Sequence, residues 1–369
     1  MPAFSDDCIA VLRALRDRHN VLVSGPPGSG KSRLLGEVAE AFQATKSLPP
    51  HQPGARVSIP KGGAPADNVA GVLPSPNRTA RVVFRTVFHQ NSKYRDFVTG
   101  LVPEVNKPGF RTSAGTLYRA SEHARTDNGA SLVIIDEINR GPAVQIFGGA
   151  LVGIESDKRL GADGKPTPRT QMFELLDPST ASIVEYAVPQ HLYIVAAMNQ
   201  ADTSVEPLDV AFLRRWAPYH LVPNVDVALR HFGLTERRNE SLPEAPSEVW
   251  HVTLALTRAW ARVNDRIAVG RGGEYQIGHG FLMRDEAPTN TLEALAYAAE
   301  TWSFIRAHID EVFFGDTFGL ATTMNIGAQD HPYRIEEVMF GDEPRMVLHA
   351  PQMVGASEVF ALLLAVIGS

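Results

Sequence analysis

The fold is decided by the stretch Gly25-Pro26-Pro27-Gly28-Ser29-Gly30-Lys31-Ser32. It follows a short apolar run, residues 21–23, and precedes a segment, residues 31–44, that is expected to be helical. The eight residues fit the pattern G-x-x-x-x-G-K-[ST], and a strand before it with a helix after it is the context that this pattern requires. The stretch therefore predicts a loop whose backbone N–H groups hold phosphates at the start of a helix.

Each residue type in the loop has a chemical reason. A side chain at Gly28 or Gly30 would obstruct the close approach of the backbone to phosphate. Lys31 is expected to place its charge on the β- and γ-phosphates, and the hydroxyl of Ser32 to coordinate Mg²⁺. The predicted nucleotide-binding residues here are Gly25, Pro26, Pro27, Gly28, Ser29, Gly30, Lys31, Ser32 and Arg33.

A second segment supplies the carboxylates. The apolar run at residues 132–135 ends in Asp136-Glu137, which places both side chains at the end of a buried strand. Asp136 is predicted to hold the metal ion, and Glu137 to orient and polarise the attacking water, an assistance that contributes roughly 10²–10⁴-fold. The loop by itself has an alternative interpretation as a Gly/Pro turn before a helix. Together the two segments predict a P-loop NTPase.

A third strand end and an arginine pair extend this site. Asn199 follows the apolar run at residues 193–197, so its amide is predicted to bond the attacking water and the γ-phosphate. Arg214 and Arg215 close a helix that begins near Pro207. We expect this pair to stabilise transition-state charge in a neighbouring subunit. The alternative is an ordinary helix C-terminus, where the helix dipole favours arginine.

Strands alternating with helices predict an α/β fold with a parallel sheet covered by helices on both faces. The predicted nucleotide-binding domain spans residues 1–224, with an inserted loop at about 46–80 and a β-hairpin at about 157–190. A smaller, mainly helical lid domain is expected at residues 225–320. A hairpin and a final helix are expected at residues 321–369.

Composition excludes several classes of protein. The net charge of −6 over 369 residues gives no chain-wide basic surface for DNA. One basic loop, at residues 158–169, could contact phosphates or a partner, although a solvated loop is the simpler interpretation. The single cysteine, Cys8, excludes an internal disulfide framework and suits a reducing compartment. No apolar run approaches the ~18 residues that span a bilayer, so no membrane partner and a cytoplasmic location are predicted.

The order of these motifs resembles that of AAA+ NTPases, and further segments are similar to the McrB branch, the motor of modification-dependent restriction systems. The likeness covers roughly residues 20–320. The segments that carry it are Phe88-His89-Gln90, Tyr94-Arg95-Asp96-Phe97-Val98-x-Gly100, Asp136-Glu137-Ile138-Asn139-Arg140, Phe147-Gly148, residues 154–159, Met198-Asn199-x-x-Asp202, Ile277-Gly278-His279-Gly280 and residues 311–316.

The resemblance implies a hexameric ring that hydrolyses GTP with Mg²⁺, is stimulated by an McrC-like nuclease subunit, and reaches DNA through partner subunits. By the same resemblance, Asn199 is the sensor and Asp202 its supporting carboxylate. Gly278 and His279 open the lid and are expected to border the nucleotide. The residues expected to act across the subunit interface are Arg140, Arg214 and Arg215.

The chain departs from the McrB pattern at two positions, Thr203 and Leu213, where the family has arginine. Because the chain begins close to the phosphate loop, we expect any reader of methylated bases to lie in another subunit or in an inserted segment. Two other functions remain open. One is an ATP-driven remodelling chaperone of the MoxR or dynein-like branches, and the other is a nucleotide-gated scaffold without useful turnover. The choice between guanine and adenine also remains open.

Overall fold

A computed structural model of the protein describes residues 4–43, 69, 71–105, 108–201, 208–283, 286–327, 331–351 and 354–368. The chain divides into two compact units. The first consists of residues 1–24 and 31–220, and the second of residues 25–30 and 221–369. The predicted phosphate loop therefore groups with the second unit, although the strand before it and the helix after it belong to the first.

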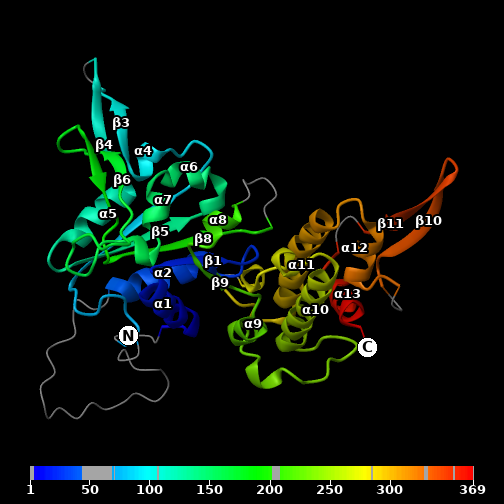
Figure 1. The fold of residues 1–369 in the computed structure, drawn as a ribbon. Helices are drawn as coiled ribbons and strands as arrows, with labels where there is room; N and C mark the ends of the chain where they lie inside the picture. The colour runs from blue at the N-terminus through cyan, green and yellow to red at the C-terminus, as the bar shows by residue number, and fades with distance from the viewer. Residues whose placement is uncertain are drawn as a thin grey trace, which may run out of the picture. The chain divides into compact units, whose positions relative to one another are not determined.

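A five-stranded sheet forms the centre of the first unit, and all its neighbouring strands are parallel (Figure 1). The central strands are almost completely buried, as expected for a parallel sheet covered on both faces. This arrangement confirms the predicted α/β fold. The strands lie in the order β2 (Ala80–Val87), β5 (Gly129–Asp136), β8 (Leu192–Met198), β1 (Asn20–Ser24) and β9 (Ala217–His220).

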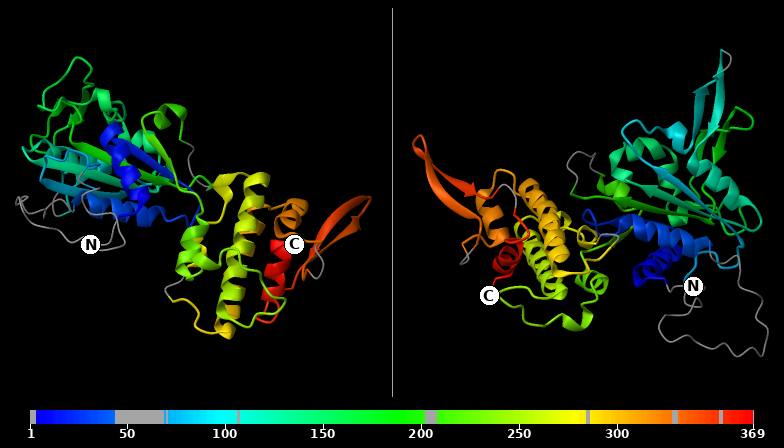
Figure 2. Two further views of the ribbon diagram at one scale, coloured as in Figure 1. Left: turned by 90° about the horizontal axis from the view of Figure 1, so that it is seen from below. Right: turned by 180° about the vertical axis from the view of Figure 1, so that it is seen from behind.

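Helices cover both faces of this sheet (Figures 1 and 2). One face carries α1 (Asp6–Arg18) and α2 (Lys31–Gln43). The other carries α5 (Thr116–Arg125), α6 (Ala143–Phe147) and α7 (Ala150–Gly153). α6 and α7 are two short helices rather than one continuous helix. Gly148 has a φ of +51° and ends α6, a backbone conformation that glycine adopts readily.

Two antiparallel hairpins extend the first unit. The hairpin of β6 (Phe173–Leu176) and β7 (Ile183–Tyr186) lies inside the span where the sequence predicted one. The hairpin of β3 (Thr99–Pro103) and β4 (Phe110–Ala114) was not predicted, and it follows the short helix α4 (Tyr94–Phe97). Of the predicted insertion, residues 46–68 and 70 lie outside the described residues, residues 71–79 form turns, and Ala80 begins β2.

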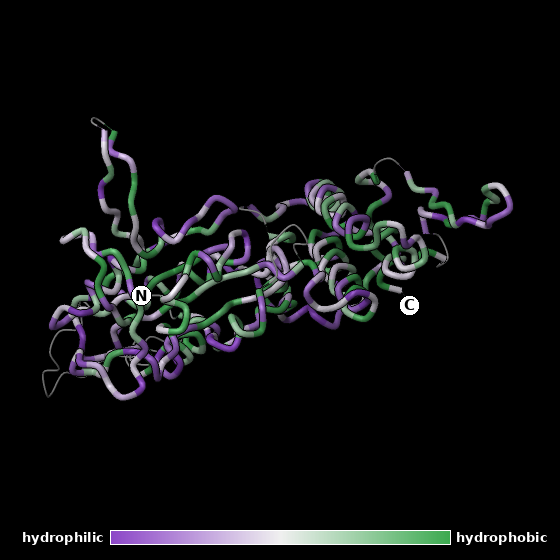
Figure 3. The backbone as a smooth tube through the Cα atoms, turned by 45° about the horizontal axis from the view of Figure 1, so that its top comes forward, coloured by the Kyte–Doolittle hydropathy of each residue, from purple (hydrophilic) through white to green (hydrophobic). Residues whose placement is uncertain are grey.

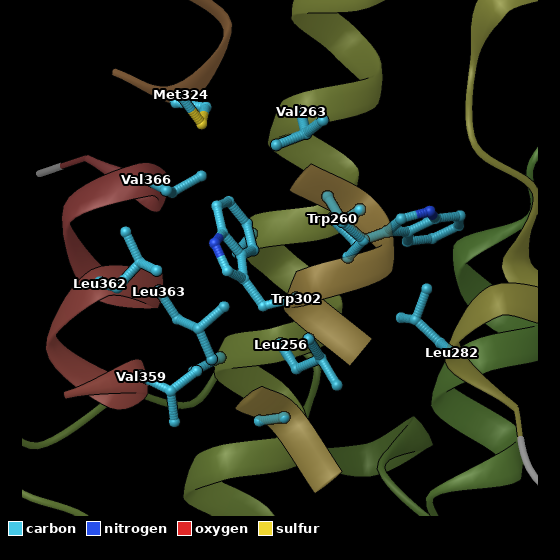
Figure 4. Packing of buried hydrophobic residues seen from close by; sticks show 14 of the residues in the cluster. Leu256, Trp260, Val263, Leu282, Trp302, Met324, Val359, Leu362, Leu363 and Val366 are labelled. Carbon is cyan, nitrogen blue, oxygen red and sulfur yellow. The ribbon is translucent and has the colours of Figure 1, made fainter. Parts of the chain in front are cut away.

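Helices build the second unit around an apolar core. Trp260 and Trp302 are fully buried there, and Trp302 packs with leucine and valine side chains of the last helix (Figure 4). The backbone tube in Figure 3 is most apolar along the sheet strands and the inner helices. The helices are α9 (Val225–His231), α10 (Val249–Gly270), α11 (Thr291–Val312), α12 (Thr317–Met324) and α13 (Val359–Ile367).

The remaining elements are short. An antiparallel ribbon of β10 (Arg334–Phe340) and β11 (Glu343–His349) belongs to the second unit. Among the described helices, none is both long enough and apolar enough to cross a membrane. The 3-10 helices are η2 (Ile138–Arg140), η3 (Ser156–Lys158), η4 (Thr235–Arg237), η5 (Gly273–Tyr275) and η6 (His279–Leu282).

A buried arginine ties together the amino edge of the sheet. Arg159 is only 2% exposed, and burial lowers its pKa to about 9. Its Nη2 donates to Asn20 Oδ1 at 2.8 Å, its Nε donates to the carbonyl of Ile154 at 2.9 Å, and its Nη1 donates to the carbonyl of Leu192. Asn20 and Leu192 are the first residues of β1 and β8. The interpretation of residues 158–169 as a solvated basic loop is therefore wrong for Arg159, whose guanidinium satisfies buried oxygen atoms.

We predict that Arg159→Met lowers the free energy of unfolding by about 3 kcal/mol, because each buried acceptor that loses its donor costs about 1–3 kcal/mol. Chemical denaturation of the purified protein measures this change. Arg169→Met is the matched control, since Arg169 is exposed in the same loop and exposed substitutions stay within about 0.5 kcal/mol. Equal stability of the two variants would show that the buried network contributes little.

Candidate nucleotide-hydrolysis site

The carboxyl ends of three central strands meet at one edge of the sheet. Ser24 at the end of β1 lies opposite Met198 in β8, and Ile135 in β5 lies opposite Ala196. Asp136, at the end of β5, and the residue that follows Met198 therefore emerge at the same edge. Parallel sheets bind ligands at this edge, because loops and helix N-termini gather there. The sheet thus brings together the strand ends that the sequence singled out.

Lys31 is a partly buried ammonium group at this edge. Burial lowers its pKa, while the nearby carboxylates of Glu137 and Asp136 act in the opposite direction. The two carboxylates therefore stabilise the charged ammonium against the cost of its burial. Lysine in such a loop is a ligand for phosphate, and the place of Lys31 beside Asp136 and Glu137 is compatible with that predicted role.

Glu137, directly after Asp136, has a strained backbone conformation. The N–H of Glu137 donates to Asp136 Oδ1 at 3.1 Å. Glu137 has φ +52° and ψ +48°, a left-handed conformation that costs a residue with a Cβ about 1–2 kcal/mol. Strain of this kind is maintained where function needs it. The carboxylate of Glu137 lies 3.2 Å from the Nε of Arg140 in its own chain. Arg140 is thus part of an exposed ion pair within its own chain. Its role across a subunit interface stays a prediction.

Asn139 joins two of the segments that form the site, a role that the motif pattern did not reveal. Its Nδ2 donates to the backbone carbonyl of Asn199 at 2.9 Å. Within the described structure, the Oδ1 atoms of Asn139 and Asn199 are both buried without a hydrogen-bond partner. Buried polar atoms are normally satisfied. These two amides therefore fit a site that binds a hydrogen-bonding molecule such as water or a phosphate group.

The predicted metal ligands, Ser32 and Asp136, suit Mg²⁺ better than an ion that takes all its ligands from protein side chains. Mg²⁺ usually takes one or two carboxylates and completes its shell with water and substrate phosphates. Ser32 is exposed in the first turn of α2, and Asp136 is partly buried at the end of β5. In the described ranges, no group of three or more His, Cys, Asp or Glu side chains could hold an ion alone. The predicted supporting carboxylate, Asp202, lies outside the described residues.

The phosphate loop contacts the predicted lid segment within the second unit. Gly28 and Gly30 have φ values of +74° and +92°, which explains glycine at both positions. The N–H of Gly278 donates to the carbonyl of Pro27 at 2.9 Å. Gly278 therefore contacts the loop itself, and its predicted contact with the nucleotide stays a prediction.

His279 also lies beside the loop. Its Nδ1 accepts a hydrogen bond from the N–H of Asn224 at 3.4 Å. A Cβ built on Gly30 would lie 3.7 Å from His279 Nε2. Ser29 is buried in the same loop, and its Oγ has no hydrogen-bond partner among the described residues. The structure places the ring of His279 at the loop, where it bonds Asn224. Its predicted role in binding the nucleotide stays a prediction.

The structure gives the two predicted trans arginines different surroundings. Arg214 is exposed directly after α8 (Val210–Leu213). The Nε of Arg215 lies 2.9 Å from Oε1 of Glu155, and these side chains are 7% and 25% exposed. The carbonyl of Arg215 accepts a hydrogen bond from Asn20 at 3.1 Å. Asn20 begins β1, so this corner lies at the amino edge, opposite the edge that carries Asp136. Arg214 is therefore the member of the pair that is available to another molecule.

Aromatic residues from three of the family-like segments pack into one cluster with Phe212 and Trp216. Phe97 and Phe147 have ring centroids 4.8 Å apart, and Phe88 lies 5.2 Å from Phe97. Phe147 also contacts Phe212 and Trp216 at 5.8 and 6.1 Å. Trp216 directly follows the arginine pair. The cluster accounts physically for aromatic residues at these positions, because it fixes the arginine corner against α4 and α6.

The chain is similar in sequence to known proteins. Residues 14–146 match the family model described as AAA domain. The EcoKMcrB subunit of a type IV methyl-directed restriction enzyme from Escherichia coli K12 is 26% identical over 279 residues, covering 74% of this chain and 49% of that protein. Component YdiS of the type II restriction enzyme BsuMI from Bacillus subtilis 168 is 28% identical over 221 residues, covering 59% of each chain. The chain thus spans about half the length of these curated relatives.

This chain was also compared with a solved structure of a protein from Cytophaga hutchinsonii that is thought to be an ATPase. The match spans 80% of this chain and 74% of that chain, with a TM-score of 0.33 and 13% sequence identity. The sheet topology, the edge site and the matched family model together define an AAA+ P-loop NTPase core. Both curated relatives are named as parts of restriction enzymes, and this chain is similar to them over the spans given above.

We predict that Arg215→Met lowers the free energy of unfolding by about 2 kcal/mol, since it leaves Glu155 without its partner in a mostly buried pair. Arg214→Met should leave stability within about 0.5 kcal/mol, because Arg214 is exposed. Thermal and chemical denaturation of both variants measures the difference. If Arg214→Met were the more destabilising variant, the assignment of Arg215 as the anchored member of the pair would be wrong.

Proposed function

We propose that the protein is the GTP-hydrolysing motor subunit of an McrBC-like restriction complex. The observation that carries the proposal is the grouping of Lys31, Asp136 and Glu137 at one edge of the sheet. The likeness to two restriction-system proteins supports the biological setting. In this proposal the partner is an McrC-like nuclease subunit, and DNA is reached through partner subunits.

The proposed chemistry follows from the position of each side chain. Bound Mg²⁺ would neutralise charge on the phosphates, with Ser32 and Asp136 as its protein ligands. Lys31 binds the terminal phosphates through its ammonium group. Glu137 accepts a proton from the attacking water as it forms its bond to phosphorus. Asn199 orients that water, and Asn139 holds the backbone of Asn199 in place.

The proposed assembly is a ring, with hexamer as the expected size and hydrolysis at subunit interfaces. Arg214 lies next to the corner anchored at the amino edge of its own sheet, whereas Asp136 lies at the carboxyl edge. An exposed cation in that position is suited to a site in a neighbouring subunit, where it would stabilise charge on the phosphates as the bond to the leaving group breaks. We assign the trans role to Arg214 and a supporting role to Arg215.

The first functional test is phosphate release with GTP, ATP, CTP and UTP. We expect a preference for GTP and a loss of turnover of at least about 10²-fold in Glu137→Gln, because the water loses its proton acceptor. Nucleotide binding, followed with a fluorescent analogue, should persist in Glu137→Gln. Glu174→Gln is the control, since Glu174 is exposed on β6.

A preference for ATP would overturn the GTP assignment and would favour the alternative, an ATP-driven remodelling chaperone acting on protein. Normal turnover by Glu137→Gln would show that another group activates the water. Either result is obtained from the same assay, so the base preference and the role of Glu137 are tested separately.

Mixed assemblies test the trans arginine. Arg214→Ala and Lys31→Ala subunits should each be inactive alone. A mixture should recover roughly a quarter of wild-type turnover, because half of the intact Lys31 sites then face a neighbour with an intact arginine. The measurement is phosphate release against mixing ratio, with mass photometry to confirm mixed rings. Confirmed mixed rings without recovery would count against donation in trans.

A further inference from the structure

Two backbone hydrogen bonds join the phosphate loop to the segment around Gly278. The N–H of Gly278 donates to the carbonyl of Pro27, and the N–H of Gly280 donates to the carbonyl of Gly28, both at 2.9 Å. In a phosphate loop the N–H groups face the anion. Here the N–H groups of Gly278 and Gly280 bond the carbonyl oxygens of the loop, which point away from the anion side. These bonds fix the orientation of the two peptide groups.

The contact is too close for any side chain at Gly278. A Cβ there would lie 2.0 Å from the carbonyl carbon of Gly28 and 2.2 Å from the nitrogen of Ser29. At Gly280 a Cβ would lie 2.9 Å from the oxygen of Gly28. Glycine is required where two backbones approach this closely. The Gly-His-Gly sequence is therefore explained by contact with the loop.

A single buried asparagine fixes this segment to α10. The N–H of Ile277 donates to Oδ1 of Asn264 at 2.7 Å, and Nδ2 of Asn264 donates to the carbonyl of Ile277 at 2.8 Å. Trp260 adds a bond from its Nε1 to the same carbonyl at 2.9 Å. Asn264 is 4% exposed, and Ile277 and Trp260 are fully buried. Figure 4 shows Trp260 on the side of the core that faces Leu282, away from α13.

The packing of the lid does not require an asparagine at this position. A buried amide is costly unless it is fully hydrogen-bonded, and an aliphatic side chain would serve a helix core as well. Asn264 uses both ends of its amide on the two backbone groups of Ile277, the residue directly before Gly278. A fully satisfied buried polar group of this kind specifies one arrangement of the chain around it.

We propose that Asn264 is a positioning residue for the phosphate-binding loop. Its amide holds Ile277, and Gly278 and Gly280 then hold the carbonyls of Pro27 and Gly28. The N–H of Gly28, opposite the carbonyl of Pro27, is thereby set for a triphosphate before it binds, while the N–H of Ser29 donates within the loop to the carbonyl of Pro26 at 3.3 Å. The inference rests on the proposed nucleotide-hydrolysing function and extends it to a residue that does not touch the nucleotide.

The proposal makes a specific kinetic distinction. An ordered loop lowers the entropy cost of binding, and the loop holds the phosphates in the ground state and the transition state alike. Loss of such uniform binding raises KM with little change in kcat. Because two hydrogen bonds that position the loop are lost, we expect the KM and the nucleotide Kd of Asn264→Leu to rise about tenfold. We expect its kcat to stay within about twofold of wild type.

Thr257→Val is the matched control. Thr257 is also fully buried on α10, but its hydroxyl donates only to the carbonyl of Thr253 in the same helix. Both substitutions remove a buried polar group from α10, and both are followed by thermal denaturation and by nucleotide titration of the full chain. A tenfold effect on Kd in Asn264→Leu, absent in Thr257→Val at comparable stability, supports the proposal. A folded Asn264→Leu protein with wild-type Kd overturns it.

Gly278→Ala tests the same contact from the loop side if Asn264→Leu does not fold. Its Cβ should displace the loop and raise the Kd, whereas Gly273→Ala, which has only Gln276 Oε1 at 3.7 Å, should not. A wild-type Kd for Gly278→Ala also overturns the proposal.

Different results would contradict the proposed function and the proposed role of Asn264. A wild-type protein that binds and hydrolyses no nucleotide contradicts the proposed function. A wild-type protein that hydrolyses nucleotide, is blocked by Glu137→Gln, and keeps its KM in the Asn264 and Gly278 variants contradicts only the role of Asn264.

Discussion

The desolvated ammonium of Lys31 is the constraint on which the first unit depends. A charge removed from water is costly unless opposite charges or hydrogen-bond partners lie nearby. The end of β5 supplies two carboxylates, which offset part of that cost. This pairing depends on the sheet, whose almost completely buried strands bring Lys31 and the carboxylates to one edge.

Charge at the opposite edge of the sheet is managed in another way. Arg159 is buried among carbonyl and amide oxygens, and the same carbonyl of Ile154 also accepts a bond from Asn20. Asn20 in turn bonds the carbonyl of Arg215, whose guanidinium pairs with Glu155. One edge thus groups Lys31 with two carboxylates, and at the other edge the guanidinium groups of Arg159 and Arg215 bond to buried oxygen atoms or pair with Glu155. Arg214 is the exception at that edge, because it is exposed beside an anchored neighbour.

Pattern and spacing were sufficient for the sheet and for the grouping of Lys31, Asp136 and Glu137 at one edge of it. Continuous apolar runs followed by Asp136 or Asn199 have few other interpretations. The β3–β4 hairpin escaped prediction because its five-residue strands contain Gly100 and Pro103, which weaken any strand pattern. The burial of Arg159 could not be predicted either, because its partners come from the starts of β1 and β8, far away in sequence. Residue type alone also could not separate Arg214 from Arg215, since the difference lies in Glu155.

For the segment Gly278-His279-Gly280, the sequence predicted a place near the nucleotide but not the contact with the phosphate loop. The sequence placed Gly278 and His279 near the nucleotide, and the structure places them against the loop that is expected to hold it. A backbone N–H can donate to only one strong acceptor at a time, so the N–H of Gly278 is already committed to Pro27. Its effect on a nucleotide must then pass through the geometry of the loop. By the same reasoning, Asn264 gains influence over the loop without contacting it, because its amide fixes the peptide groups of Ile277 directly before the contact begins.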